Sequence, residues 1–138
     1  AASDVYKRQG YGITTPGLAS ILQKTRQPFN ANLLAQEAAL AALADEEHQA
    51  KTKEITDEGR ELLQNEFEKM GIEFVTSYAN FVLIKVGDGD AVFEKMLQKG
   101  VIVRAMRGYK LPEWIRVSIG TKDENMKFLE LLRSIITQ

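Results

Sequence analysis

The chain has 138 residues, with 18 Lys and Arg against 19 Asp and Glu, a single His and no Cys. This length fits one domain, and the absence of Cys excludes a disulfide framework and any thiolate metal or redox site. A net charge of −1, and no apolar run of ~18 residues, argue against nucleic acid, a charged membrane surface or a bilayer as partners. We therefore expect a soluble, cytoplasmic protein of α/β or α+β class with no metal site.

The first 45 residues are heterogeneous. Residues 1–9 show no periodicity and no cap, and they look unlike the rest of the chain. The following residues predict a short strand around residues 11–13, a turn at 15–17 and a helix of about two turns that ends before Pro28. Asn30 or Asn32 can cap a second helix, LLAQEAALAALA, whose composition predicts burial on most sides.

A long charged helix is predicted over residues 46–70. Leu63, Phe67 and Met70 belong to a narrow apolar stripe along it, and Gly71 is a natural stop. A helix this long and this polar is typical of a segment that bridges two parts of a larger molecule.

From residue 72 the pattern alternates between strands and helices. IEFVTS, NFVLIKV, VIVRAM and WIRVSIG read as four strands, and AVFEKMLQK reads as a helix capped by Asp90 and closed by Gly100. Thr121 and Glu124 form a capping box for a final helix. The order predicted from residue 47 is α-β-β-α-β-β-α.

Two arginines stand in otherwise apolar strands. In VIVRAM the alternation separates Arg104 from Val101 and Val103, and in WIRVSIG it separates Arg116 from Ile115 and Val117. A guanidinium within an apolar strand needs a partner, and its planar fork suits a carboxylate or a phosphate. The two side chains could therefore clamp an anionic substrate, or each could form a structural ion pair with one of the 19 acidic residues.

Other polar residues carry weaker signals. Asp88 and Asp90 flank a glycine, but the rest of a calcium-loop pattern is absent, so a turn and a helix cap are expected there. His48 is expected to be solvated, Tyr78 and Asn80 to serve a turn, and Trp114 to lie in the core.

Taken in order, the motifs GYGITTPGLASILQKTRQPFNANLLAQEAALAAL, SYANFVLIKV, GVIVRAM and LPEWIRVSIGTKDENMKFLELL resemble the C-terminal part of class I/II aminotransferases. The resemblance covers about residues 8–136, and the branch of the family that acts on histidinol phosphate matches best. It implies the small domain of a fold type I enzyme that depends on pyridoxal phosphate, acts on small molecules in histidine biosynthesis and forms a homodimer.

The resemblance also implies roles for three arginines. Those of the VIVR and WIRVSIG motifs, Arg104 and Arg116, would bind the anionic group of the substrate, either a phosphate or the carboxylate of glutamate or 2-oxoglutarate. Arg8 occupies the place of an arginine that contacts the cofactor phosphate.

The chain departs from the family at its beginning. The family's Ser-Lys motif, whose lysine forms the Schiff base with the cofactor, would fall immediately before residue 1, so the chain contains no catalytic lysine. We expect residues 1–9 to be a non-native leader, 10–45 a remnant of the large cofactor-binding domain, and 46–138 the bridging helix and small domain. The isolated chain is then expected to be inactive and to bind no pyridoxal phosphate by itself.

The residues alone are also compatible with two functions other than that of an enzyme. One is a stand-alone α+β binding or regulatory module in which the two arginines capture a small anionic metabolite. The other is a structural interaction domain with ion-paired arginines. In the first of these, the Ala- and Leu-rich helix 33–44 would have to be covered within the chain itself, because monomers rarely leave large apolar patches open.

Overall fold

The computed structural model describes residues 12–26 and 33–136. The chain divides into two compact units, Ala1–Gln49 and Ala50–Gln138. The described elements are, in chain order, α2 (Pro16–Thr25), α3 (Leu33–Ala44), α4 (Glu46–Lys69), β1 (Phe74–Val75), β2 (Phe81–Lys85), α5 (Gly89–Gln98), β3 (Arg104–Ala105), the 3₁₀ helix η1 (Arg107–Tyr109), β4 (Trp114–Ser118) and α6 (Lys122–Ile136).

In the first unit, α2 starts where a turn is predicted. Thr15 is its N-cap residue and Pro16 its first residue, a position where a proline fits because no backbone N–H is needed there. The predicted turn at 15–17 is therefore the beginning of the helix, and residues 12–15 form no strand. The features predicted for Tyr11, Pro28 and Asn30 or Asn32 lie outside the described residues.

The prediction that α3 is buried on most sides is wrong for the structure described. Ala35 is its one buried residue, while Leu33, Leu34, Leu40 and Leu43 are 65–82% exposed. An apolar helix becomes buried only when another surface covers it, and the described residues leave these four leucines open.

The long helix α4 forms as predicted, and local signals set both of its ends. At its start, the Asp45 carboxylate accepts a hydrogen bond from the backbone N–H of His48 (3.0 Å). At its end, Gly71 adopts a φ of 66°, the left-handed conformation that glycine allows, and its N–H donates to the carbonyl of Glu68 (3.0 Å).

The second unit contains a four-stranded antiparallel sheet with the order β1-β2-β4-β3. The longest pairing joins β2 to β4, with Val82 opposite Val117 and Ile84 opposite Ile115. The sequence predicts longer outer strands than the structure has, because β1 and β3 contain two residues each. The 3₁₀ helix η1 between β3 and β4 is an element that the predicted order lacks.

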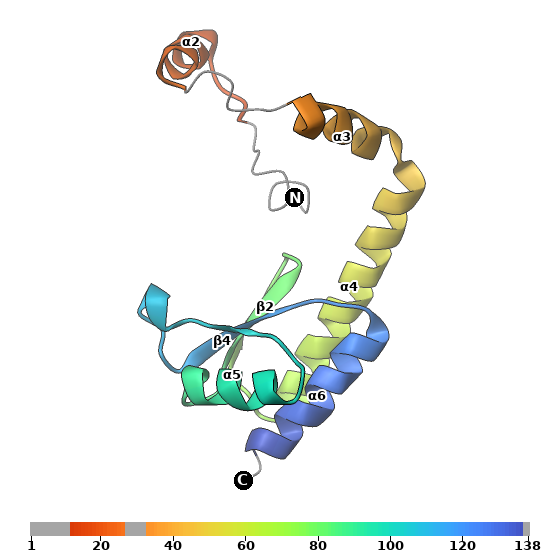
Figure 1. Ribbon diagram of the computed structural model, residues 1–138, viewed down its shortest axis with the longest axis vertical. Helices are drawn as coiled ribbons and strands as arrows, with labels where there is room; N and C mark the ends of the chain where they lie inside the picture. The colour runs from red at the N-terminus through yellow and green to blue at the C-terminus, as the bar shows by residue number, and fades with distance from the viewer. Residues whose placement is uncertain (1–11, 27–32, 137–138) are drawn as a thin grey trace. The chain divides into compact units, whose positions relative to one another are not determined.

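Three helices cover one face of this sheet. Leu63 and Phe67 of α4, residues of α5, and Phe128, Leu129 and Leu132 of α6 join the inward-facing residues of β2 and β4 in one buried cluster. In Figure 1, α4 and α6 run beside each other, and the Glu66–Arg133 ion pair links them. The apolar period of each element therefore builds a two-layer unit with a single core.

Among the described residues of this unit, no α-helix covers the opposite face of the sheet. The register places Phe81 and Leu83 of β2 and Trp114 and Arg116 of β4 on that face, since their strand neighbours point into the core. Trp114 is half-buried there and does not belong to the core, contrary to prediction. Along β4 it alternates with Ile115, whose side chain points to the core face of the sheet. We call this surface the open face.

The start of α5 fixes the connection between β3 and β4. Asp88, and not Asp90 as predicted, caps α5, since its carboxylate accepts the N–H groups of Asp90 and Ala91 (3.1 Å each). Gly89 donates its N–H to the carbonyl of Pro112 (2.9 Å), and a Cβ at this position would lie 2.5 Å from the carbonyl oxygen of Trp114. Asp90 is left to pair with Arg107 of η1. The segment between β3 and β4, the strands that carry Arg104 and Arg116, is thereby bound to the start of α5 by Gly89 and by Asp90.

Among the described residues, no helix combines the length and the apolar character that crossing a bilayer requires.

Candidate functional site

Arg104 and Arg116 face each other on the open face. β3 and β4 are antiparallel, and Arg104 of β3 is the direct partner of Arg116 of β4. Directly opposite residues of an antiparallel pair point to the same side of the sheet, with Cβ atoms roughly 4.5–5.5 Å apart. The structure thus brings together the two arginines that the sequence predicts as an anion clamp.

Neither arginine has an acidic partner among the described residues. Ion pairs engage Arg60, Arg107 and Arg133, whereas no carboxylate lies within 4.0 Å of Arg104 or Arg116. Two positive charges directly opposite each other destabilise a sheet. The structural ion pair considered from the sequence is therefore absent from the described part of the chain, and the pair of guanidinium groups remains available for an anion.

Phe81 supports Arg116 from the neighbouring strand. The guanidinium carbon of Arg116 lies 5.0 Å from the centroid of the Phe81 ring, within the range of a cation–π contact. The sequence alone does not single out Phe81 as a functional residue. The signal was present, since alternation in NFVLIKV puts Phe81, Leu83 and Lys85 on one face, but the pairing of β2 with β4 was not known.

Lys85 belongs to the same face but carries a partnered charge. Its Nζ atom lies 3.4 Å from the Glu73 carboxylate and 3.8 Å from that of Glu113. The available positive charge on the described open face is therefore concentrated at the two arginines.

The calcium reading of residues 88–90 finds no support. Asp88 caps α5 and Asp90 pairs with Arg107, whose pKa is raised above its already high ordinary value because its guanidinium donates a hydrogen bond to the Asp90 carboxylate. No group of three or more metal-ligating side chains occurs among the described residues. Both carboxylates have structural roles here.

The structure describes three of the four remaining candidates. Arg8 is outside the described residues, so its contact with a cofactor phosphate stays a prediction. His48 is exposed, as expected. Tyr78 is 92% exposed in the β1–β2 turn, where Asn80 accepts a hydrogen bond from the backbone N–H of Ile119 (2.9 Å).

A hollow beside α4 is chemically different from the open face. Its lining includes the carboxylates of Asp57, Glu61 and Glu68 together with Arg60, whose guanidinium is engaged by Asp57. Bonds from Lys53 and Arg60 hold the pKa of Asp57 below its ordinary value, so this lining stays anionic. It is unsuited to an anionic ligand.

Comparison with known proteins shows to which family the chain belongs. The sequence profile of the family "Aminotransferase class I and II" matches residues 5–132. The chain belongs to this family. Its members depend on pyridoxal phosphate, as the sequence resemblance implies.

Histidinol-phosphate aminotransferases are prominent among the relatives of this aminotransferase chain. The chain is 52% identical over 129 residues to the histidinol-phosphate aminotransferase of Akkermansia muciniphila, covering 94% of the chain and 36% of the relative. It is 40% identical over 129 residues to that of Methylobacillus flagellatus, covering 94% and 35%. The chain thus spans about a third of the length of these curated relatives.

Solved structures give the same fold. The histidinol-phosphate aminotransferase of Clostridium acetobutylicum matches with a TM-score of 0.76 at 23% identity, over 88% of this chain and 38% of the other. That of Sinorhizobium meliloti, solved in complex with pyridoxal-5'-phosphate, matches with a TM-score of 0.70 at 26% identity, over 89% and 36%. The chain has the fold of this part of an aminotransferase, and nothing in the comparisons supports a stand-alone regulatory module.

Proposed function

We propose that the chain is the substrate-binding C-terminal part of a histidinol-phosphate aminotransferase, which exchanges an amino group between histidinol phosphate and 2-oxoglutarate or glutamate in histidine biosynthesis. The observation that carries this proposal is the pair Arg104 and Arg116, opposite each other on the open face and without acidic partners in the described chain. The names of the relatives and their 40–52% identity support the choice of reaction.

In the proposed enzyme, these arginines bind and orient the substrate through its anionic groups. Each guanidinium can donate two parallel hydrogen bonds to a carboxylate or phosphate, which fixes both the distance and the plane of the bound group. The connection held by Gly89 and the Asp90–Arg107 pair keeps the strands that carry them in register. Their role is positioning by charge, and neither moves a proton, because an arginine stays protonated.

The described residues of the open face are suited to bind the substrate, but they do not include a lysine suited to hold the cofactor. Pyridoxal phosphate, when bound, supplies the electron sink for amino transfer. On the open face the lysine described, Lys85, is paired with Glu73 and Glu113, and the sequence contains no Ser-Lys motif. We therefore expect the 138-residue chain to perform no amino transfer by itself.

The organisation expected from the sequence is kept within this proposal. Residues 10–45 would belong to the large domain and 46–138 to the bridging helix and small domain, with 1–9 as a non-native leader. The exposed leucines of α3 favour packing against a further part of a longer protein. A homodimer and a cytoplasmic location are part of the same expectation.

The test measures whether the chain binds anions. Backbone amide NMR spectra are recorded while 2-oxoglutarate or inorganic phosphate is added. We expect saturable shifts confined to β3 and β4. Arg116→Gln and Arg104→Gln should each weaken binding roughly 10-fold or more, since a hydrogen bond to a charged group is lost. Lys127→Gln is the matched control, because it removes the same charge from an exposed position on α6, which covers the other face.

Two results would contradict the proposal. One is that neither 2-oxoglutarate nor phosphate causes saturable shifts at β3 and β4. The other is binding by the arginine variants that equals binding by the Lys127 control. The uncharged dimethyl ester of 2-oxoglutarate should leave the spectrum unchanged, which separates charge recognition from nonspecific contact.

A further inference from the structure

The contact between Phe81 and Arg116 crosses two strands. In the register of β2 and β4, Phe81 is opposite Ser118 and Leu83 is opposite Arg116, so Phe81 and Arg116 are diagonal neighbours on the open face. Diagonal positions are within reach of aromatic and long side chains. The guanidinium carbon lies 5.0 Å from the ring centroid, within the range of a cation–π contact.

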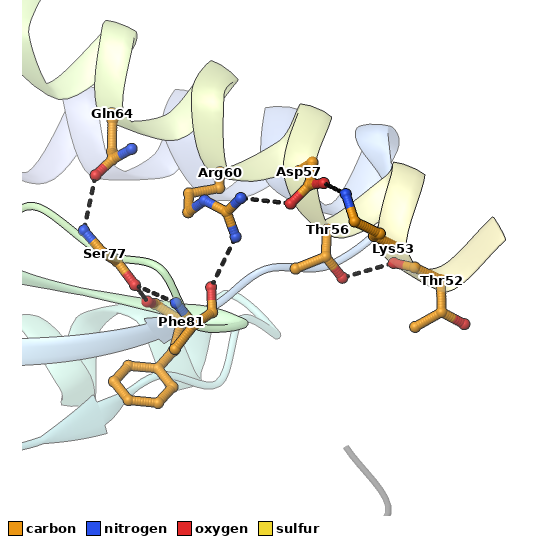
Figure 2. Close-up of polar contacts among 9 residues, drawn as sticks. Thr52, Lys53, Thr56, Asp57, Arg60, Gln64, Ser77 and Phe81 are labelled. Atoms are coloured by element: carbon orange, nitrogen blue, oxygen red, sulfur yellow. Dashed lines mark hydrogen bonds and ion pairs between the residues drawn. The ribbon is translucent and has the colours of Figure 1, made fainter. Parts of the chain in front are cut away.

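Phe81 is itself held by the turn that precedes β2. The Ser77 hydroxyl donates to the Phe81 carbonyl (2.5 Å) and accepts the N–H of Ala79 (3.1 Å), which closes the turn. The Asn80 carbonyl accepts the N–H of Ile119, beyond the end of β4 (2.9 Å). Figure 2 shows the Phe81 ring turned away from α4, while its backbone faces Ser77.

Two side chains of α4 fasten this turn. The Gln64 side-chain oxygen accepts the N–H of Ser77 (3.0 Å), and Arg60 donates to the carbonyl of Ala79 (3.3 Å). Arg60 also pairs with Asp57, and its side chain is only 20% exposed. Figure 2 shows the resulting chain of contacts from Asp57 through Arg60 to the turn that carries Phe81.

We propose that Phe81 is a positioning residue that keeps the Arg116 guanidinium aimed at the anion site, and that α4 holds Phe81 in place through Arg60 and Gln64. This inference rests on the proposed function, in which Arg116 binds the substrate anion. A long arginine side chain loses conformational freedom when it binds, and a support that removes that freedom beforehand strengthens binding. The aromatic ring is suited to this task because it attracts the cation without competing for its N–H donors.

The first experiment measures the side-chain Nε–Hε NMR signal of Arg116 together with the affinity for inorganic phosphate. In Phe81→Leu the ring-current shift of that signal should disappear, and the affinity should fall about 2- to 5-fold. Phe81→Tyr should restore both. Tyr109→Leu is the matched control, since it removes an exposed aromatic ring from η1 and should change neither quantity.

The second experiment tests the support from α4. Arg60→Gln should move the Arg116 signal and weaken phosphate binding, whereas Lys53→Gln should do neither. Both cations pair with Asp57, but of the two only Arg60 also bonds to the β1–β2 turn. The amide spectrum of each variant verifies that the fold is retained, and Phe81 lies outside the buried cluster.

The outcomes separate this inference from the proposed function. A Phe81→Leu protein that is folded, with an unshifted Arg116 signal and unchanged affinity, overturns the positioning role. Wild-type protein that binds neither phosphate nor 2-oxoglutarate overturns the proposed function instead, and the Arg116 signal in the free protein still shows whether Phe81 restrains the guanidinium. If Arg60→Gln and Lys53→Gln behave alike, the role of α4 is refuted.

Discussion

The open face places like charges side by side on neighbouring strands. Arg104 and Arg116 are direct partners across β3 and β4, and the described residues provide no carboxylate that would offset their repulsion. A protein selected only for stability would gain by replacing one of them with a β-branched residue. At the scale of single residues, we expect the proposed binding site to lower the stability of the sheet.

This trade-off can be measured with Arg104→Thr. The substitution removes the repulsion and introduces a residue that favours strands, so the free energy of unfolding should rise by about 0.2–1 kcal/mol. Arg107→Thr is the control, because Arg107 is paired with Asp90 and its loss should give no gain. Urea unfolding followed by circular dichroism measures both. A lower free energy of unfolding for Arg104→Thr would show that the pair is not repulsive.

Helix ends are where local chemistry determines the second unit most directly. In α6 the Thr121 hydroxyl accepts the N–H of Glu124 (3.4 Å), and the Glu124 carboxylate accepts the N–H of Thr121 (2.8 Å). These two bonds form the capping box predicted from the sequence. Asn125, the next residue, bonds to both the N–H and the carbonyl of Gly120 (3.0 Å each), which ties the end of β4 to α6.

The capping box predicts a pH dependence at this element. Hydrogen bonds from the backbone and the side chain of Thr121 lower the pKa of Glu124 from its ordinary 4.5. Because the folded-state pKa is the lower one, the stabilisation is complete above pH 4.5 and is lost as the pH falls through the folded-state pKa. Glu124→Gln should therefore be less stable than wild type at pH 7, and the difference should shrink toward pH 3.

Urea unfolding at a series of pH values between 7 and 3 measures this effect. Glu130→Gln on the same helix makes the same charge change away from the capping box, and its difference from wild type should vary less over that range. A pH profile of Glu124→Gln parallel to that of wild type would exclude the carboxylate bonds as its cause.

At the scale of the whole molecule, the buried apolar cluster belongs to one unit. Every residue of the cluster, from Leu63 to Leu132, lies within Ala50–Gln138. In the first unit, α2 has no buried residue and α3 has one. Since burial of apolar area is the main driving force for folding, the second unit contains what is needed to fold.

A chain limited to residues 50–138 should therefore keep the cooperative unfolding of the 138-residue chain. We expect its midpoint of thermal unfolding to lie within a few degrees of the full chain, with the loss confined to the first turn of α4. Near-ultraviolet circular dichroism of Trp114 reports on the packing of the second unit. Loss of that signal or of cooperativity in the shortened chain would show that the first unit contributes to the core.

Features that depend on neighbours in sequence were predictable from the residues alone. Alternation separated Arg104 from Val101 and Val103, and Arg116 from Ile115 and Val117, and Gly71, Gly100 and the Thr121–Glu124 pair marked helix ends. These signals span at most a few residues, so no knowledge of the fold is needed to interpret them.

Other features depend on which distant segments meet. The strand order β1-β2-β4-β3 makes Arg104 and Arg116 direct partners and brings Phe81 beside Arg116. The choice of Asp88 as cap, with Asp90 drawn to Arg107, likewise depends on where η1 lies. Periodicity says which way a side chain points but not what it meets, because strand pairing joins residues far apart in the chain. The residue types of the proposed anion clamp were thus predictable, whereas only the paired sheet brings its two arginines together.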